Sequence, residues 1–204
     1  QVVSRYLVPL LPSVGLLGLA ALRLATHRLV PGRRDLALGA AVAAFAFQNV
    51  IVTLAVSAPH ARRHTEGLRT SVAELGIWAR ESTPPHTLFA VADIGAFGYY
   101  SDRPVLDLYG LVTPRMAPYV VRDGYDAVVW NLLFEPVGRP AYLIDRSTRP
   151  ARLVPPDDPA NPYRFLFARS IPDLGITRPT PYFYSVYTID WALYDRLHPR
   201  VAEE

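Results

Sequence analysis

A run of 24 residues without a charged side chain, Leu36 to Pro59, constrains this chain more than any other feature of its sequence. A helix of about 20 apolar residues is long enough to cross the hydrocarbon core of a bilayer. A second uncharged run of 17 residues, Tyr6 to Leu22, reaches the short end of the spanning range. The two runs predict two membrane-spanning helices in residues 1–59, joined by a short Arg-rich loop over residues 23–35. The alternative for each run is a buried helix in the core of a soluble protein.

The charge of the chain supports the membrane interpretation. Residues 1–59 carry five Arg and one acid, whereas the remaining residues carry 16 Arg and 17 acids. The positive excess therefore flanks the apolar runs, as in membrane proteins, and does not indicate a nucleic-acid surface. We expect the lipid bilayer as a partner and no nucleic acid. The dense Arg of the 23–35 loop favours the cytoplasmic side for that loop, which would place residues 60–204 outside.

The rest of the chain predicts a juxtamembrane helix and a small domain. Apolar residues recur at helical spacing over residues 60–82, and Thr83 and Pro84 then end the helix. Residues 83–204 are numerous enough for a core of their own. The expected fold is a membrane α-helical segment with two spans (1–59), an amphipathic helix (60–82) and a small extracytoplasmic α/β or α+β domain (83–204).

Short apolar segments bounded by turn residues predict the strands of that domain. The expected strands are 88–92, 105–108, 140–145, 164–169 and 184–191, and residues 127–130 are expected to form either a further strand or a short buried helix. Period-two alternation makes the last of them an edge strand or part of a hairpin. Its many aromatic residues have two interpretations, stacking on sugar faces or ordinary core and interface packing. The Pro-rich segment 146–162 is expected to be a surface loop.

The segment Ala92 to Leu111 contains the candidate site. Asp93 follows a buried strand, two glycines predict a turn, and Tyr99 and Tyr100 come next. Asp107 lies in the second strand of the segment. Groups at the carboxyl ends of strands in an α/β layer face the crevice where ligands bind. The other interpretation of Asp93 is that its side chain caps the next helix or turn.

This segment, DIGAFGYYSDRPVLDLYGLV, resembles a stretch in the extracytoplasmic C-terminal domain of bacterial polytopic membrane glycosyltransferases of the C superfamily. Those enzymes take sugars from polyprenyl-phosphate carriers and include protein mannosyltransferases and arabinofuranosyltransferases. The resemblance covers about twenty residues closely, in a pattern roughly Asp-x-Gly-Ala-x-Gly-Tyr, a turn, and a strand ending Asp-Leu-x-Gly-Leu. The matching positions are Asp93, Gly95, Ala96, Gly98, Tyr99, Asp107, Leu108, Gly110 and Leu111.

The resemblance implies a function for the chain as the C-terminal portion of such an enzyme in the bacterial inner membrane. The partners would be a polyprenyl-phosphate sugar donor, a glycan or protein acceptor, and further membrane helices of the same protein. Substrate contacts would come from Asp93, Tyr99, Tyr100 and Asp107. Arg5 and Tyr6 resemble the start of a late span in these enzymes, where an Arg would pair with the carrier phosphate.

The catalytic groups are not expected in this chain. In the superfamily the essential acid lies upstream, in the first extracytoplasmic loop, so we expect no catalytic residue in residues 1–204 and an inactive fragment. A divalent metal, where one is used, would be held by upstream residues. The chain shows no Ser-His-Asp arrangement, zinc spacing or P-loop, and no cysteine. His60 and His64, four residues apart, lack the nearby acids of a metal site.

Two other function classes remain open from the sequence. The second hypothesis is a non-enzymatic, membrane-anchored binding or assembly module of the cell envelope, because a complete catalytic set is missing. A soluble hydrolase with a buried apolar hairpin is the third reading, and it requires the 24-residue run to lie in a water-soluble core.

Overall fold

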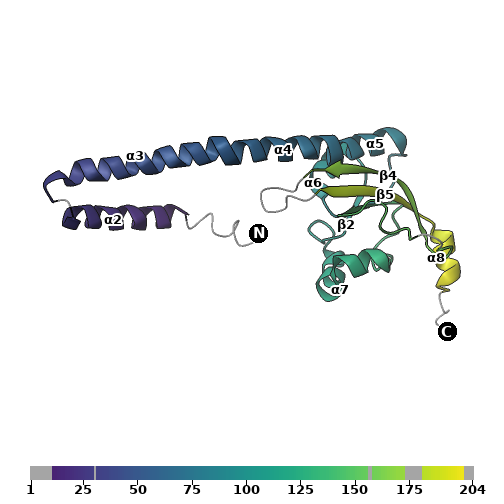
Figure 1. The fold of residues 1–204 in the computed structure, drawn as a ribbon. Helices are drawn as coiled ribbons and strands as arrows, with labels where there is room; N and C mark the ends of the chain where they lie inside the picture. The colour runs from purple at the N-terminus through teal and green to yellow at the C-terminus, as the bar shows by residue number, and fades with distance from the viewer. Residues whose placement is uncertain (1–10, 30, 156–157, 173–180, 200–204) are drawn as a thin grey trace. The chain divides into compact units, whose positions relative to one another are not determined.

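The computed structural model describes residues 11–29, 31–155, 158–172 and 181–199. The chain divides into two compact units, Gln1–Arg62 and Arg63–Glu204. Helices and strands are labelled in Figure 1. The helices are α2 (Leu11–Leu29), α3 (Arg34–Val52), α4 (Ala58–Leu68), α5 (Glu74–Ser82), α6 (Ile94–Ser101), α7 (Ala117–Trp130) and α8 (Trp191–Leu197). The strands are β1 (Phe89–Val91), β2 (Val105–Asp107), β3 (Tyr142–Ser147), β4 (Tyr163–Ile171) and β5 (Tyr182–Ile189).

The first unit contains a helical hairpin. The short 3₁₀ turn η2 (Pro31–Arg33) joins α2 to α3, and the two helices pack against each other. A π-helical turn, η3 (Thr53–Ser57), continues α3 into α4 without a break. Asn49 in α3 donates from its side-chain amide to the carbonyl of Phe45 at 2.8 Å. Its amide therefore bonds to its own helix, whereas a bond to a neighbouring helix is the usual expectation inside a membrane.

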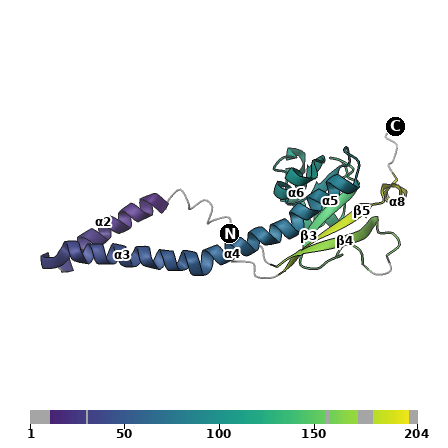
Figure 2. The same cartoon turned by 90° about the horizontal axis from the view of Figure 1, so that it is seen from above.

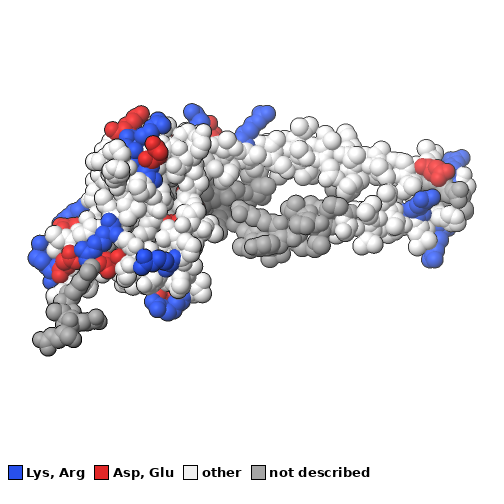
Figure 3. All heavy atoms as spheres, turned by 180° about the vertical axis from the view of Figure 1, so that it is seen from behind, with Lys and Arg blue, Asp and Glu red and all other residues white. Residues whose placement is uncertain are grey.

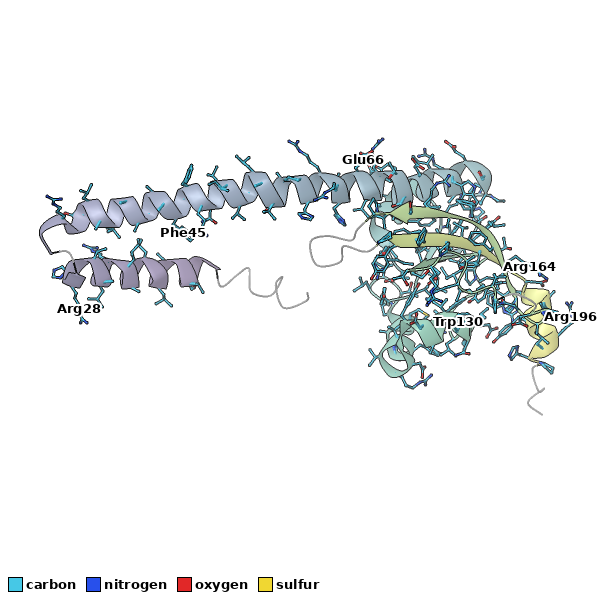
Figure 4. All side chains as sticks on the ribbon, in the orientation of Figure 1. Arg28, Phe45, Glu66, Trp130, Arg164 and Arg196 are labelled. Atoms are coloured by element: carbon cyan, nitrogen blue, oxygen red, sulfur yellow. The ribbon has the colours of Figure 1, made fainter. Side chains whose placement is uncertain are left out.

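The apolar side chains of this hairpin are exposed. Leu17, Phe45 and Leu54 each keep about two-thirds or more of their surface accessible. In the described residues, one helix, Asp35–Ser82, is long and apolar enough to cross a membrane by length and composition. The expected first span, Tyr6–Leu22, lies partly outside the described residues. Charged side chains gather at the turn between α2 and α3, and the stretch of α3 beyond it is free of them (Figure 3); Figure 4 shows Phe45 on that stretch.

The second unit is built on a five-stranded mixed sheet in the order β2-β1-β3-β5-β4. β1 pairs in parallel with β2 and with β3, while β5 is antiparallel to both β3 and β4. Figure 2 shows β3, β5 and β4 side by side. The β4–β5 hairpin confirms one of the two expectations for the Tyr-rich segment. The edge-strand expectation is wrong, because β5 lies between β3 and β4 and has buried side chains on both of its faces.

Helices cover both faces of the sheet. The core on one face joins α5 and α6 to the strands through Leu75, Phe97 and Phe89. The core on the other face joins α7 to the strands through Val129 and Leu143. The sheet therefore lies between α5–α6 and α7 (Figure 1). A long N-terminal helix followed by a small mixed α/β domain is the architecture that the sequence predicts in outline.

The glycine-containing segment after β1 is a helix, so the predicted turn is wrong. Gly95 and Gly98 lower helix propensity, but Phe97 is fully buried in the core beside α5 and packing outweighs that cost. The helix ends at Asp102, which adopts a left-handed conformation with φ 49°. Arg103 then donates to the carbonyls of Thr83 at 2.7 Å and Asp102 at 3.0 Å. One cation thus holds the carbonyl ends of α5 and α6 together.

The Pro-rich segment is only partly a surface loop. Its first residues, Arg146 and Ser147, belong to β3. Leu153 is fully buried in the core under α7 and hydrogen-bonds through its carbonyl to the Asn161 side chain at 2.6 Å. A turn-rich composition therefore does not keep this segment on the surface, because a single Leu anchors it.

Candidate functional site

Three parallel strands, β1, β2 and β3, end at one edge of the sheet, which we name the carboxyl edge. Val91, the last residue of β1, pairs with Asp107, the last residue of β2, and with Ile144 of β3, which continues for three more residues to Ser147. The chain leaves β1 for α6 on one face and leaves β2 for α7 on the other. In open α/β sheets, ligands bind outside the carboxyl ends of strands whose connections diverge in this way.

Asp93, two residues beyond β1, lies at the centre of an edge cluster with Arg146 and Tyr184. Nη1 of Arg146 donates to both carboxylate oxygens of Asp93, at 2.9 and 2.7 Å. The Tyr184 hydroxyl donates to Oδ2 of Asp93 at 2.8 Å. Asp93 occupies the N-cap position of α6, but its side chain makes no capping hydrogen bond. The capping interpretation is therefore wrong, because a cation on β3 and a hydroxyl on β5 bind the carboxylate instead.

The charge states of the edge cluster follow from its partial burial. Burial raises the pKa of Tyr184, and the negative charge of Asp93 raises it further, so the hydroxyl remains a donor. Burial lowers the pKa of Arg146, but the Asp93 carboxylate raises it and the net shift is upward. The cluster is thus a carboxylate anion that binds an arginine cation on one side and a neutral phenol on the other. The Asp93 side chain keeps 34% of its surface exposed.

Tyr109 places an aromatic ring at the carboxyl edge. It follows β2, keeps 36% of its surface exposed and stacks on Tyr125 with ring centroids 5.3 Å apart. The carboxyl edge therefore combines a carboxylate, a guanidinium and an aromatic face, three groups that suit a polyhydroxylated ligand.

A second cluster of the same residue types, named the inner cluster, lies on the opposite face of β3. Asp145 is fully buried and pairs with Arg152, whose Nε and Nη2 lie 2.7 and 2.9 Å from the two carboxylate oxygens. The Tyr125 hydroxyl donates to Oδ1 of Asp145 at 2.9 Å. Burial raises the pKa of Tyr125 well above its usual value, with Asp145 adding to the shift. Arg152 also reaches Asp126 at 2.8 Å, so the cluster joins α7 to β3 and the loop beyond it.

Asp107 is fully buried, and its carboxylate binds backbone groups. Its two oxygens accept from the N–H groups of Tyr109 and Val112, both at 2.9 Å. The Thr113 hydroxyl accepts from the Asp107 N–H at 3.0 Å. Asp107 therefore fixes the loop that carries Tyr109.

Tyr99 and Tyr100 lie on α6, away from the edge cluster. Tyr99 is six residues beyond Asp93, which corresponds to roughly 9 Å along a helix. It is 82% exposed and meets Tyr100 edge to face at 5.0 Å. Tyr100 lies against Gly76 of α5. The structure does not bring this pair together with Asp93.

The expected carrier-phosphate residues, Arg5 and Tyr6, lie outside the described residues. Within the described ranges, no group of three or more His, Asp or Glu side chains is arranged to hold a metal ion.

Sequence reasoning missed Arg146, Tyr184 and Tyr109 as members of the site. Arg146 was assigned to a surface loop, and Tyr184 was considered only among the aromatic residues of its strand. One usable signal existed in the sequence, because Asp93 and Arg146 each come directly after a short apolar run, 88–92 and 140–145. Strands that pair in parallel bring such residues to the same edge.

The family described as a domain of unknown function, DUF8728, matches residues 58–192, which is most of the chain. Neither a curated protein nor a solved structure matches.

Proposed function

The chain belongs to the DUF8728 family, and on that premise we propose that it is the C-terminal part of an integral-membrane glycosyltransferase. The enzyme moves a sugar from a polyprenyl-phosphate carrier to a glycan or protein acceptor of the bacterial cell envelope. The edge cluster of Asp93, Arg146 and Tyr184, open at the carboxyl edge, is the observation that carries the proposal. Its role is to bind the hydroxyl groups of the sugar acceptor.

The apolar hairpin supports the membrane part of the proposal. The exposed apolar side chains of α2 and α3 would cost free energy in water, at about 25 cal/mol per Å² of apolar surface. A bilayer removes that cost, and helices satisfy their own backbone groups there. In the proposal the two apolar runs, 6–22 and 36–59, both span the inner membrane, further spans belong to the same protein, and residues 83–204 lie outside the cytoplasm.

The hydrogen-bonding capacity of Asp93 supports a hydroxyl-bearing ligand. A carboxylate has about four acceptor positions. Arg146 and Tyr184 occupy one on Oδ1 and two on Oδ2, which leaves an acceptor position on Oδ1. The exposed part of Asp93 can thus accept from one hydroxyl of a ligand. A phosphate would meet the negative charge of Asp93 first, so the donor phosphate is bound elsewhere in the enzyme.

Tyr109 supports a sugar among hydroxyl-bearing ligands. Sugar rings present an apolar face that packs on aromatic rings, and Tyr109 is a partly exposed ring at the carboxyl edge. Its own position is fixed, because its backbone N–H is held by Asp107 and its ring rests on Tyr125. Such a preorganised surface binds with little ordering cost.

The chemistry of transfer is divided between this chain and upstream residues in the proposal. Asp93 is held by a guanidinium and a phenol, so it serves as a hydrogen-bond acceptor for the substrate. The base that deprotonates the acceptor hydroxyl is the upstream acid expected from the resemblance. The described residues contribute acceptor binding and orientation, which raise the rate by positioning.

The test compares two arginine variants of the full-length enzyme in native membranes. Arg146→Met removes the guanidinium of the edge cluster, and Arg149→Met changes an exposed arginine three residues away. The readout is transfer of radiolabelled mannose or arabinofuranose from the polyprenyl-phosphate donor to endogenous acceptors. We expect transfer to fall roughly tenfold or more in Arg146→Met, the effect of losing about 1.4 kcal/mol of transition-state binding, and to persist in Arg149→Met.

Two outcomes oppose the proposal. Equal transfer by both variants excludes the edge cluster as an acceptor site. Membranes that lack any transfer dependent on the wild-type protein favour the other function class, a membrane-anchored binding or assembly module without enzymatic activity.

A further inference from the structure

The chain enters the α/β domain from its N-terminal side at the carboxyl edge of the sheet. The chain passes from α5 into β1 and from α6 into β2, and both strands begin at the edge opposite the carboxyl edge. Both helices therefore end at that opposite edge, where Arg103 binds their carbonyl ends together, and begin at the carboxyl edge. The helix that precedes α5 confirms this direction, because Gly67 lies against Ile171. Ile171 is the last residue of β4, which runs parallel to β3 and therefore also ends at the carboxyl edge.

An apolar loop projects at the same edge, between β2 and α7. Leu111 is 79% exposed and Val112 is 62% exposed. The backbone of this loop is fixed, because both oxygens of the Asp107 carboxylate accept from its N–H groups. Gly110 adopts φ +81° and lies so close to Ala117 that a Cβ there would be 2.7 Å from its nitrogen. The exposure of these two side chains is therefore built into the fold.

We propose that the loop of residues 109–112 inserts Leu111 and Val112 into the lipid bilayer that the apolar hairpin spans. This inference rests on the membrane topology in the proposed function. Seven residues, 60–66, separate the apolar run that ends at Pro59 from Gly67 at the carboxyl edge. The chain is therefore too short to carry the carboxyl edge far from the membrane surface. Apolar side chains presented there reach the boundary between headgroups and acyl chains.

The positive charge beside the loop also favours a lipid bilayer as its partner. Arg115, exposed and three residues beyond Val112, lies in the 3₁₀ turn η5 (Pro114–Met116) between the loop and α7. Arg side chains near a bilayer surface are attracted by anionic lipid phosphates. An apolar tip flanked by an Arg is thus complementary to an anionic bilayer.

The absence of cysteine from the chain allows a direct test with single probes. Leu111→Cys and Leu197→Cys are each labelled with an environment-sensitive nitrobenzoxadiazole fluorophore in the full chain, reconstituted in phosphatidylethanolamine–phosphatidylglycerol vesicles. Leu197 is the matched control, because it is 45% exposed and its helix, α8, follows the end of β5 at the opposite edge of the sheet. Brominated lipids quench a probe inside the bilayer, and aqueous iodide quenches a probe in water.

We expect blue-shifted emission at residue 111, with roughly half of the intensity lost to brominated lipid, since apolar faces at a bilayer interface lie about 5–10 Å into the boundary region. At residue 197 we expect quenching by iodide alone. Iodide quenching at both positions overturns the proposal. A probe at residue 111 that neither quencher reaches also overturns it, since a protein then covers the loop. The readout requires no sugar transfer, so it separates this proposal from the proposed enzymatic activity.

Discussion

The edge cluster and the inner cluster use the same three residue types with different burial. Each places an Asp between an Arg and a Tyr, and their β3 members, Asp145 and Arg146, are adjacent in sequence on opposite faces of the sheet. Asp145 is fully buried, whereas Asp93 is about one-third exposed. The difference shows that burial, and not residue type, separates a structural ion pair from a candidate binding site.

The largest expected effect is on the inner cluster. Asp145→Asn removes the carboxylate that pairs with Arg152 and accepts from Tyr125. We expect the free energy of unfolding to fall by about 3 kcal/mol, because the mostly buried Arg152 then keeps only the exposed carboxylate of Asp126 as an ionic partner. Urea unfolding of the full chain in detergent micelles, followed by near-ultraviolet circular dichroism, measures this loss. A loss below about 1 kcal/mol, the usual value for an exposed pair, would remove the distinction between the clusters.

The loop of residues 109–112, at the carboxyl edge, provides the next test. Gly110→Ala forces a side chain into a left-handed conformation and against Ala117. We expect a loss of about 1–3 kcal/mol in the free energy of unfolding, the usual cost of a strained backbone position. Because this loop carries Tyr109, sugar transfer should also fall. Gly124→Ala is the control, because Gly124 has a similar φ of +79° but no neighbour within 4 Å of the added Cβ. A Gly124→Ala variant that reduces transfer equally would show that strain alone, without displacement of the loop, causes the effect.

The two clusters should also make the domain sensitive to alkali. The pKa values of Tyr125 and Tyr184 are raised in the folded chain, so above pH ~10 the unfolded chain loses tyrosine protons that the folded chain retains. Stability is therefore complete below pH ~10 and falls as pH rises, by up to about 1.4 kcal/mol per pH unit for each tyrosine. Tyr125→Phe and Tyr184→Phe should each reduce the slope, measured from urea unfolding between pH ~9 and ~11. An unchanged slope in both variants would contradict the raised pKa values.

The smallest expected effect on stability is at the edge cluster. Asp93→Asn should lower the free energy of unfolding by about 1 kcal/mol or less, because the Asp93 side chain is about one-third exposed and water already screens its pairing with Arg146. The same urea experiment compares it directly with Asp145→Asn. Equal losses in the two variants would mean that both clusters are structural.

Local signals predicted the parts of the fold that depend on neighbouring residues. Apolar runs between turn residues located β1, β2, β3, β4 and β5, and Thr83 and Pro84 marked the end of α5. The helix α6 was missed because its glycines favour a turn locally, and only the burial of Phe97 against α5 reverses that preference. Tertiary packing, which local propensity does not contain, decided that element.

Only part of the candidate site could be predicted from the sequence. Asp93 was recognisable from its place at the end of a buried strand. Its partners Arg146 and Tyr184 lie 53 and 91 residues away in sequence. Their contact depends on the pairing of β1 with β3 and of β3 with β5, which no local pattern specifies. Asp107 shows the same limit, since only the loop geometry reveals that backbone groups occupy its carboxylate.

The measurement that tests the central claim most directly is the acceptor dependence of sugar transfer by Asp93→Asn in the full-length enzyme. Asp102→Asn is the matched control, because Asp102 is exposed and asparagine tolerates its left-handed conformation. If Asp93 binds the acceptor and the catalytic acid lies upstream, the acceptor KM rises roughly tenfold, about 1.4 kcal/mol of lost binding, while kcat stays close to wild type. An unchanged acceptor KM in Asp93→Asn would contradict the assignment of the edge cluster as the acceptor site.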